Sequence, residues 1–381
     1  MGKAIDLLRN YWDSRISGLT LQALAERLYT ETGGEEFVVD NPGTLMKLLF
    51  LWSYMRFPYL HIMGSQREKH RKNNRQAKLF YLDPYAGNGV VKVRIEKDNE
   101  IRVPGSAVLA LLVPTLLHKE RSKIMNYIWD VMVLNDVSDK HQQELIRRYT
   151  YIFKDLFTKE FILPLNYKIY REAPSPPLSA DYTVIISSYD CSQETTWVKF
   201  SQFLNAIKGQ KGWLHGLVFL DPPSPAEMPL SFIPRLLSVP SDIITLLHTG
   251  IFAENVFKRI YKPETLMNIL NCDYKLAESL LQQTHTKDEL EKLYLDRFCV
   301  LLSNTKMHVG RGSPIRDFIR PIRLRTKRGH YYLVIATRTT GGEKYIEWQN
   351  WLDRFAAEVE ALNDIQPIVI DILLSRQATL N

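Results

Sequence analysis

The segment Asp83-Pro84-Tyr85-Ala86-Gly87-Asn88-Gly89 has the residue types of a cofactor-binding turn. It directly follows the apolar run Leu79–Leu82, which is typical of a buried strand. Glycines at this place let a ligand approach the backbone closely, and ligands bind at the carboxyl ends of parallel strands. We therefore predict a cofactor site made by Asp83, Pro84, Tyr85, Gly87 and Gly89.

The pattern of this turn disfavours two kinds of phosphate site. The dinucleotide fingerprint needs a third glycine where this chain has Lys92, and no Gly-Lys-Ser/Thr of a P-loop follows. An acid before the glycines instead suits a cationic ligand, such as S-adenosylmethionine with its amino group and sulfonium. The alternative is a tight turn capped by Asp83 that binds nothing.

Two further acids follow predicted strands and could complete an adenosine site. Asp136 ends the run Val131–Asn135 and could accept both ribose hydroxyls, although it could equally begin the next helix. Asp190 follows Val184–Tyr189 and could meet an adenine amino group.

The segment Asp221-Pro222-Pro223 follows a fourth predicted strand and forms our candidate catalytic turn. An acid and two prolines make a rigid, exposed turn, and rigid placement of reactants supplies much of the rate in a transfer reaction. Asp221 could accept a hydrogen bond from an acceptor amine, and the Pro222 carbonyl could accept another. The alternative is a turn that merely ends the strand.

The elements that must position these residues alternate along the chain. We predict strands near 79–83, 130–135, 183–187, 216–220 and 242–248, with helices near 105–117, 138–152, 195–208 and 229–237. Short apolar strands separated by helices indicate an α/β protein with a mostly parallel sheet covered on both faces. The predicted domains are an N-terminal helical extension (1–41), an α/β core (42–250), a helical insertion (251–312), and a core-completing β-hairpin with C-terminal helices (313–381).

The net charge of +7 is concentrated in two basic clusters, which predict a polyanionic partner. The alternative is a solvated surface. The candidate nucleic-acid contacts are Arg67, Lys69, Arg71, Lys72 and Arg75 in the first cluster, and Arg320, Arg323, Arg325, Lys327 and Arg328 in the second.

Other classes of protein have little support in the sequence. Cys191, Cys272 and Cys299 are far apart, which disfavours a disulfide framework and a zinc ribbon, and no metal site is predicted. The first residues lack the apolar core of a signal peptide, and the longest apolar run, Ala107–Leu117, is too short to span a membrane. We therefore expect a cytoplasmic protein with no membrane partner.

The order of these motifs resembles the three-Cys-motif partner proteins, a bacterial family. The resemblance covers about residues 42–350, and it is carried by Lys47, Asp83–Gly89, Gly105-Ser106-Ala107, Asp221-Pro222-Pro223 and Tyr331–Thr337. It implies a class I S-adenosylmethionine-dependent methyltransferase-like (Rossmann-like) fold whose last strand is antiparallel, and a protein partner that bears three cysteines. A predicted hairpin over 320–337 agrees with such a last strand.

The chain also departs from that family. Tyr85 stands where a Phe is usual, and Pro222-Pro223-Ser224 where Pro-Phe-Gly is usual. The Asp-Pro-Pro form is similar to methyltransferases that act on amino groups of nucleic-acid bases, which place an aromatic ring next to stack on the flipped base. Ser224 cannot stack.

Our leading hypothesis is a methyltransferase that uses S-adenosylmethionine and acts on nucleic acid, in a mobile-element or phage-defence context. The alternatives are a catalytically inactive partner subunit that kept the fold, and a methyltransferase of a protein or small molecule.

Overall fold

A computed structural model provides the structure of the chain. It describes residues 10–11, 13–16, 18–34, 38–39, 43–73, 76–96, 99–120, 128–156, 167–174, 182–208, 212–307, 315–326, 329–338 and 343–364. Within these ranges no helix is both long and apolar enough to cross a membrane.

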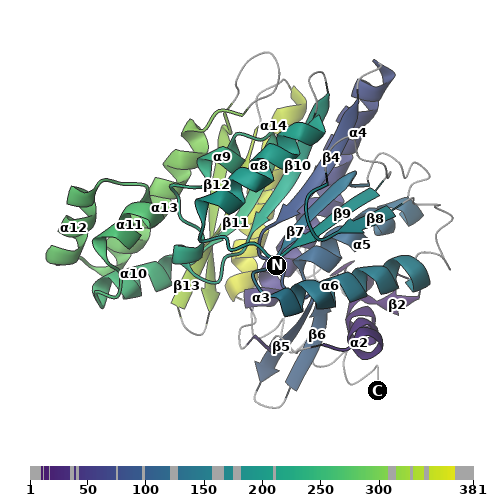
Figure 1. The fold of residues 1–381 in the computed structure, drawn as a ribbon, viewed down its shortest axis with the longest axis horizontal. Helices are drawn as coiled ribbons and strands as arrows, with labels where there is room; N and C mark the ends of the chain where they lie inside the picture. Colours follow the sequence, from purple (N-terminus) through teal and green to yellow (C-terminus); the bar gives the residue numbers. More distant parts are fainter. Residues whose placement is uncertain are drawn as a thin grey trace.

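An eight-stranded, mostly parallel sheet forms the centre of the fold (Figure 1). Its strand order is β12 (Phe318–Thr326), β13 (Gly329–Thr337), β11 (Ser241–Leu247), β10 (Trp213–Leu220), β4 (Ala77–Asp83), β7 (Val131–Asn135), β9 (Tyr182–Ser187) and β8 (Tyr167–Tyr170). The pairs from β11 to β8 are all parallel, whereas β13 is antiparallel to both of its neighbours. The predicted α/β class, parallel core and terminal hairpin are therefore confirmed.

The strand order reverses at β4, which places a topological switch point between β4 and β10. From β4 the chain builds β7, β8 and β9 on one side, and it then returns to β10 on the other side. In open α/β sheets ligands bind at the carboxyl ends of the strands at such a point. Asp83 ends β4, and Asp221 directly follows β10.

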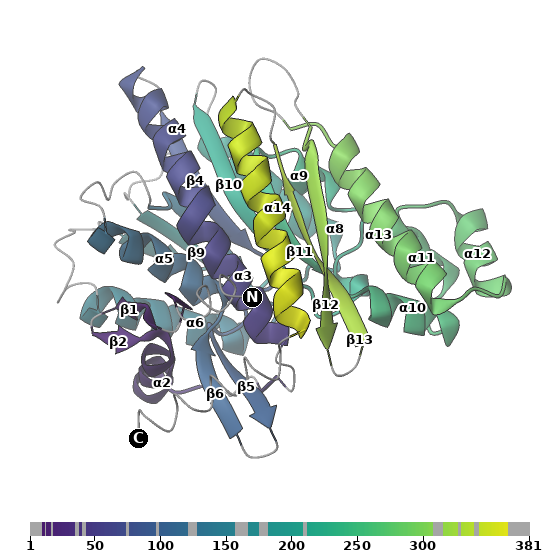
Figure 2. The ribbon, with the colours of Figure 1, turned by 180° about the vertical axis from the view of Figure 1, so that it is seen from behind.

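Helices cover both faces of this sheet, and strand side chains alternate between the two resulting cores. Leu79 and Tyr81 pack toward α3 (Gly43–Tyr54) and α5 (Ser106–Glu120), whereas Phe80 and Leu82 pack toward α8 (Glu194–Lys208). Figure 2 shows α14 (Glu343–Asp364), together with α3 and α4 (Leu60–Lys72), on the face opposite to α8. This double cover explains why the strands are apolar throughout.

A β-hairpin that we did not predict separates the glycine turn from the helix that follows it. β5 (Val90–Glu96) and β6 (Asn99–Pro104) pair antiparallel, and β3 (Val38–Val39) adds a parallel third strand. The alternation of apolar and charged residues in Val90–Glu96 is the signal of a half-buried strand. The ends of the hairpin meet again, because the Gly105 amide donates to the Gly89 carbonyl at 2.9 Å.

The N-terminal region contains less helix than predicted. The sequence predicted a helical extension over 1–41, but β1 (Arg15–Ile16) and β2 (Leu19–Thr20) form a short antiparallel pair before α2 (Leu21–Thr32). Gly18 has φ of 76° in the turn between these two strands, and the Thr20 side chain caps α2.

Four helices form the predicted insertion between β11 and β12: α10 (Thr249–Phe257), α11 (Pro263–Leu270), α12 (Tyr274–Gln282) and α13 (Lys287–Asn304). Thr286 and Glu289 form a capping box at the start of α13. The part of the predicted C-terminal helices beyond residue 364 lies outside the described residues.

Candidate functional site

Asp83 is a fully buried carboxylate at the carboxyl end of β4. It accepts hydrogen bonds from the Ser106 hydroxyl (2.5 Å), the Tyr85 amide (3.1 Å) and the Tyr81 hydroxyl (3.3 Å). Burial raises the pKa of Asp83 to about 7, and the nearby Asp221 carboxylate acts in the same direction, against the lowering effect of these hydrogen bonds. Ser106 is the first residue of α5, so the helix that follows the β5–β6 hairpin begins in contact with Asp83.

The two glycines of the turn have different roles. Both have positive φ, 59° at Gly87 and 88° at Gly89. A Cβ on Gly87 would meet nothing within 4 Å, so the turn is open at this residue. A Cβ on Gly89 would lie 2.8 Å from Leu145 Cδ1 and 2.9 Å from Val108 Cγ2, so Gly89 is required for packing. Of the two, only Gly87 is placed to let a ligand reach the backbone.

Asn135, which sequence reasoning did not select, joins the loops after β4, β7 and β9. Its Nδ2 donates to the carbonyls of Pro84 (3.0 Å) and Tyr189 (2.9 Å). Its Oδ1 accepts from the Tyr189 amide (2.7 Å) and the Ser187 hydroxyl (2.8 Å). A polar residue that ends an otherwise apolar strand was the available signal for this role.

Asp136 and Asp190 both form local turns at the carboxyl edge of the sheet. Asp136 Oδ1 accepts from the Ser138 amide (2.9 Å) and lies 3.1 Å from His141 Nδ1, while Ser138 itself caps α6 (Asp139–Tyr151). Asp190 is exposed, and hydrogen bonds from Ser192 lower its pKa. We considered Asp136 as a possible cap of this helix, but Ser138 is the residue that caps it.

The charges of four carboxylates act on the buried Cys191 at the carboxyl edge of the sheet. Burial is the main reason that the pKa of its thiol is raised, and Asp190, Glu227, Asp136 and Asp83 each raise it further. Glu227, which sequence reasoning missed, has a raised pKa because of burial and because of the charges of Asp190 and Asp136. Among the described residues, no Lys or Arg forms an ion pair with Asp83, Asp190 or Glu227.

Tyr85 connects the two sides of the switch point. Its hydroxyl donates to the Glu227 carbonyl at 2.6 Å, so the turn after β4 is tied to the loop after β10. Burial raises the pKa of Tyr85 well above its ordinary value. The side chain therefore acts as a link between loops.

Asp221 lies in an ion pair with Lys47 of α3, and the two side chains are each 17% exposed. His248, which follows β11, donates a hydrogen bond to the Pro222 carbonyl. Burial lowers the pKa of His248, while Asp221 raises it. Pro222 is buried and Pro223 is exposed. Lys47 was noted only as part of the family resemblance, and His248 was missed.

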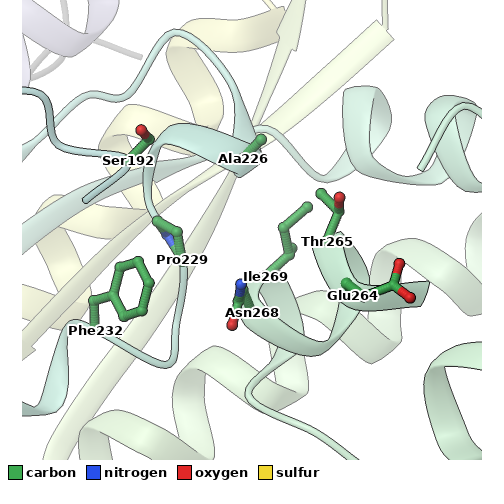
Figure 3. Close-up of a pocket in the computed structure, with 8 residues that line it drawn as sticks. All are labelled: Ser192, Ala226, Pro229, Phe232, Glu264, Thr265, Asn268 and Ile269. Atoms are coloured by element: carbon green, nitrogen blue, oxygen red, sulfur yellow. The ribbon is translucent and has the colours of Figure 1, made fainter. Parts of the chain in front are cut away.

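A pocket of about 190 Å³ lies next to the acidic group, where α11 of the insertion meets the core (Figure 3). Ser192 and Ala226 lie close in sequence to Asp190 and Glu227, which connects the pocket to the same edge of the sheet. It contains none of the predicted cofactor residues. Its lining is made by Ser192, Ala226, Pro229, Phe232, Glu264, Thr265, Asn268 and Ile269.

The first basic cluster is only partly available for a partner. Arg67 is 3% exposed and donates to Asp130 Oδ1 (2.5 Å) and the Ile128 carbonyl (2.7 Å), which corrects its prediction as a phosphate contact. The exposed residues are the last turn of α4, where Lys72 pairs with Glu68 (3.0 Å) and Arg71 lies 3.8 Å from Asp130. Lys69 is exposed, and Arg75 lies outside the described residues.

The second cluster lies on the terminal hairpin. Arg323 is exposed, and Arg320 lies 3.8 Å from Glu360. The backbone of Arg325 pairs with His330, while Lys327 and Arg328 lie outside the described residues. β12 is parallel to β11, so this cluster approaches the carboxyl edge that holds Asp221, whereas α4 ends at the opposite edge (Figure 2).

Comparisons with known proteins do not identify a family. No protein-family model and no curated protein matches the chain. One similar solved structure is the crystal structure of protein LPL1258 from Legionella pneumophila str. Philadelphia 1, of the family described as DUF519. The match covers 80% of this chain and 92% of that one, at 10% identity and a TM-score of 0.34, and carries no argument about function.

Proposed function

We propose that the chain is a methyltransferase that uses S-adenosylmethionine and acts on the amino group of a nucleic-acid base. The observation that carries this proposal is the group of carboxylates around the open turn at Gly87, at the switch point of the sheet. Burial raises the pKa values of Asp83 and Glu227, nearby carboxylates raise them further, and among the described residues neither has a Lys or Arg partner, so a cationic ligand is favoured here. The sulfonium and amino group of the cofactor carry that charge.

The strand arrangement supports a class I methyltransferase-like fold. β13 is antiparallel and lies between β11 and β12, which run in the same direction. An antiparallel last strand within a parallel sheet is what the resemblance to the three-Cys-motif partner proteins implies.

The residues of the turn fit the parts of this cofactor. Gly87 offers its backbone. The pKa of Asp83 is about 7, and a cation beside it would favour the ionised form, because opposite charges attract. Asp136 Oδ2 has no hydrogen bond from the described residues and can accept from ribose hydroxyls. When bound, the cofactor supplies a reactive methyl group.

The acceptor would bind on the β10 side of the switch point. Asp221 can accept a hydrogen bond from an amine once Lys47 moves away from it. The Pro222 carbonyl already accepts from His248, and its second lone pair can accept from the same amine. The role of these residues is to orient the amine toward the methyl group, because positioning gives much of the rate of such a transfer.

The test is transfer of tritiated methyl groups to mixed DNA and RNA, with a three-cysteine partner present and absent. Asp221→Ala should lose about 100-fold or more in transfer, and its cofactor affinity should stay within about twofold of wild type, because Asp221 follows β10 and is not part of the glycine turn after β4. Asp190→Asn is the matched control, because Asp190 is predicted to contact the cofactor and not the acceptor. Equal transfer by wild type and Asp221→Ala would remove Asp221 from the site.

The Lys47–Asp221 ion pair favours a second candidate, a partner subunit that binds the cofactor without catalysis. Lys47 occupies the carboxylate that the acceptor needs, and Ser224 provides no ring to stack on a base. This candidate predicts tight cofactor binding by wild type with no methyl transfer under any of the conditions above.

A further inference from the structure

A buried ion pair lies directly beneath the glycine turn. Arg148 and Glu144, on successive turns of α6, are 0% and 1% exposed, with Arg148 Nη2 3.8 Å from Glu144 Oε2. Arg148 Nη1 donates to the Asn88 carbonyl, and the Asn88 side chain donates to Glu144 Oε2 at 2.9 Å. Asn88 lies between Gly87 and Gly89, so this pair holds both the backbone and the side chain at the centre of the turn.

The N-terminal extension contacts the same pair. Arg148 Nη2 donates to the Gly33 carbonyl at 3.2 Å. Gly34, with φ of 121°, packs so closely on Glu144 that a Cβ there would lie 2.6 Å from the Glu144 carboxyl carbon. The chain that leaves α2 thus contacts both members of the ion pair.

α2 is itself fixed to the core on two sides. Glu26 forms an ion pair with Arg102 of β6 at 2.6 Å, and Arg27 donates to the Tyr151 hydroxyl at 2.8 Å. The extension therefore contacts the hairpin that follows the glycine turn as well as the helix beneath it.

We propose that Arg148 is a positioning residue for the glycine turn and that the N-terminal segment at Gly33 and Gly34 controls this positioning through the Arg148–Glu144 pair. An Arg is suited to the role because its planar guanidinium can donate to two different carbonyls at once. One guanidinium thereby fixes the distance between Asn88 and Gly33. A change at Gly34 that moves Glu144 would release the Asn88 side chain, although Gly34 itself is not part of the turn.

The test compares Gly34→Ala with Gly18→Ala in the full chain. Both positions have positive φ, so an alanine strains the backbone at each. Only the Gly34 methyl group collides with Glu144, because a Cβ on Gly18 would meet nothing within 4 Å. Gly18 lies in the turn between β1 and β2, whereas the Gly33 carbonyl accepts from Arg148, so Gly18→Ala is the control for backbone strain without displacement of the ion pair.

The first readout is hydrogen exchange of the amides from Tyr85 to Val90, which does not depend on any cofactor. Gly34→Ala should exchange about tenfold faster there than wild type, and Gly18→Ala should stay within about twofold, since local opening of the turn becomes easier only in the first variant. Equal exchange in the two variants would overturn the inference. If Gly34→Ala does not fold, Arg148→Lys replaces it, with the same expected result and the same contradicting one.

The second readout is affinity for S-adenosylmethionine, and only this part rests on the proposed function. Gly34→Ala should bind about tenfold more weakly than Gly18→Ala, which corresponds to the same loss of order in the turn. Faster exchange in a protein whose wild type binds no cofactor would support the positioning role and contradict the proposed function. Unchanged exchange in Gly34→Ala, together with cofactor binding by wild type, would contradict the positioning role and support the proposed function.

Discussion

At the scale of single residues, Asp83 lies at the candidate site, and its burial lowers the stability of the fold. It is fully buried, and burial raises its pKa to about 7. The folded chain therefore binds a proton on this group more tightly than the unfolded chain does, so stability falls as pH rises from about 4 to about 7. Residues of this kind are retained for function rather than for stability.

We predict that Asp83→Asn unfolds at a higher urea concentration than wild type at pH 8, with a gain on the order of 4 kcal/mol at most. The gain should disappear near pH 4, where Asp83 is protonated in both states. Asp242→Asn is the matched control, because burial raises the pKa of Asp242 to about 6 at the opposite end of the sheet. An Asp83→Asn protein with the pH dependence of wild type would contradict this explanation.

The two glycines of the turn should respond differently to the same substitution. Gly89→Ala should destabilise the protein by about 1–3 kcal/mol more than Gly87→Ala, because the added methyl group overlaps Leu145 and Val108. Gly87→Ala keeps only the cost of positive φ, about 1–2 kcal/mol. Urea unfolding of both variants measures the difference, and equal losses would show that Gly89 is not confined by packing.

At the scale of elements, the sequence predicts the regular parts of the fold well and the exceptions poorly. The apolar runs that became β4, β7, β9, β10 and β11 are visible because both faces of the sheet are covered. β8 and the β5–β6 hairpin were missed. The alternating pattern of Val90–Glu96 was present but lay inside the expected strand–turn–helix unit.

The basic clusters show why charge in a sequence does not locate a surface. Arg67 belongs to a run of basic residues, yet it is buried because Asp130 pairs with it from a distant part of the chain. Arg316, which starts the second run, is also buried, with its guanidinium donating to Ser241 and Leu237. Such partners depend on tertiary contacts that local sequence does not reveal.

The positions of the two clusters give a prediction about nucleic-acid binding. Arg323→Ala should reduce the slope of log K against log salt by about one unit, because its strand approaches the edge that holds Asp221. The triple change of Lys69, Arg71 and Lys72 to Ala should leave the slope nearly unchanged, since α4 ends at the opposite edge. Fluorescence anisotropy with single-stranded and duplex DNA measures both, and the reverse pattern would place the nucleic acid along α4.

At the scale of the whole molecule, three additions to the sheet surround the candidate site. The β5–β6 hairpin begins and ends at the glycine turn, α11 of the insertion lines the adjacent pocket, and the N-terminal segment contacts Arg148 beneath the turn. Each addition is distant in sequence from the others. Their contacts place each of them beside the glycine turn or the adjacent pocket, which are the parts of the molecule that we propose as the site.

The central claim is that the carboxylates around Gly87 bind S-adenosylmethionine, and calorimetric titration at pH 8 tests it most directly. Wild type and Asp242→Asn should bind the cofactor equally, whereas Asp83→Asn should bind about tenfold or more weakly because it lacks the buried charge. Gly87→Val should not bind, because its branched side chain fills the open side of the turn. Folded wild type that releases no heat with S-adenosylmethionine or its demethylated product, alone and with its partner, would contradict the claim.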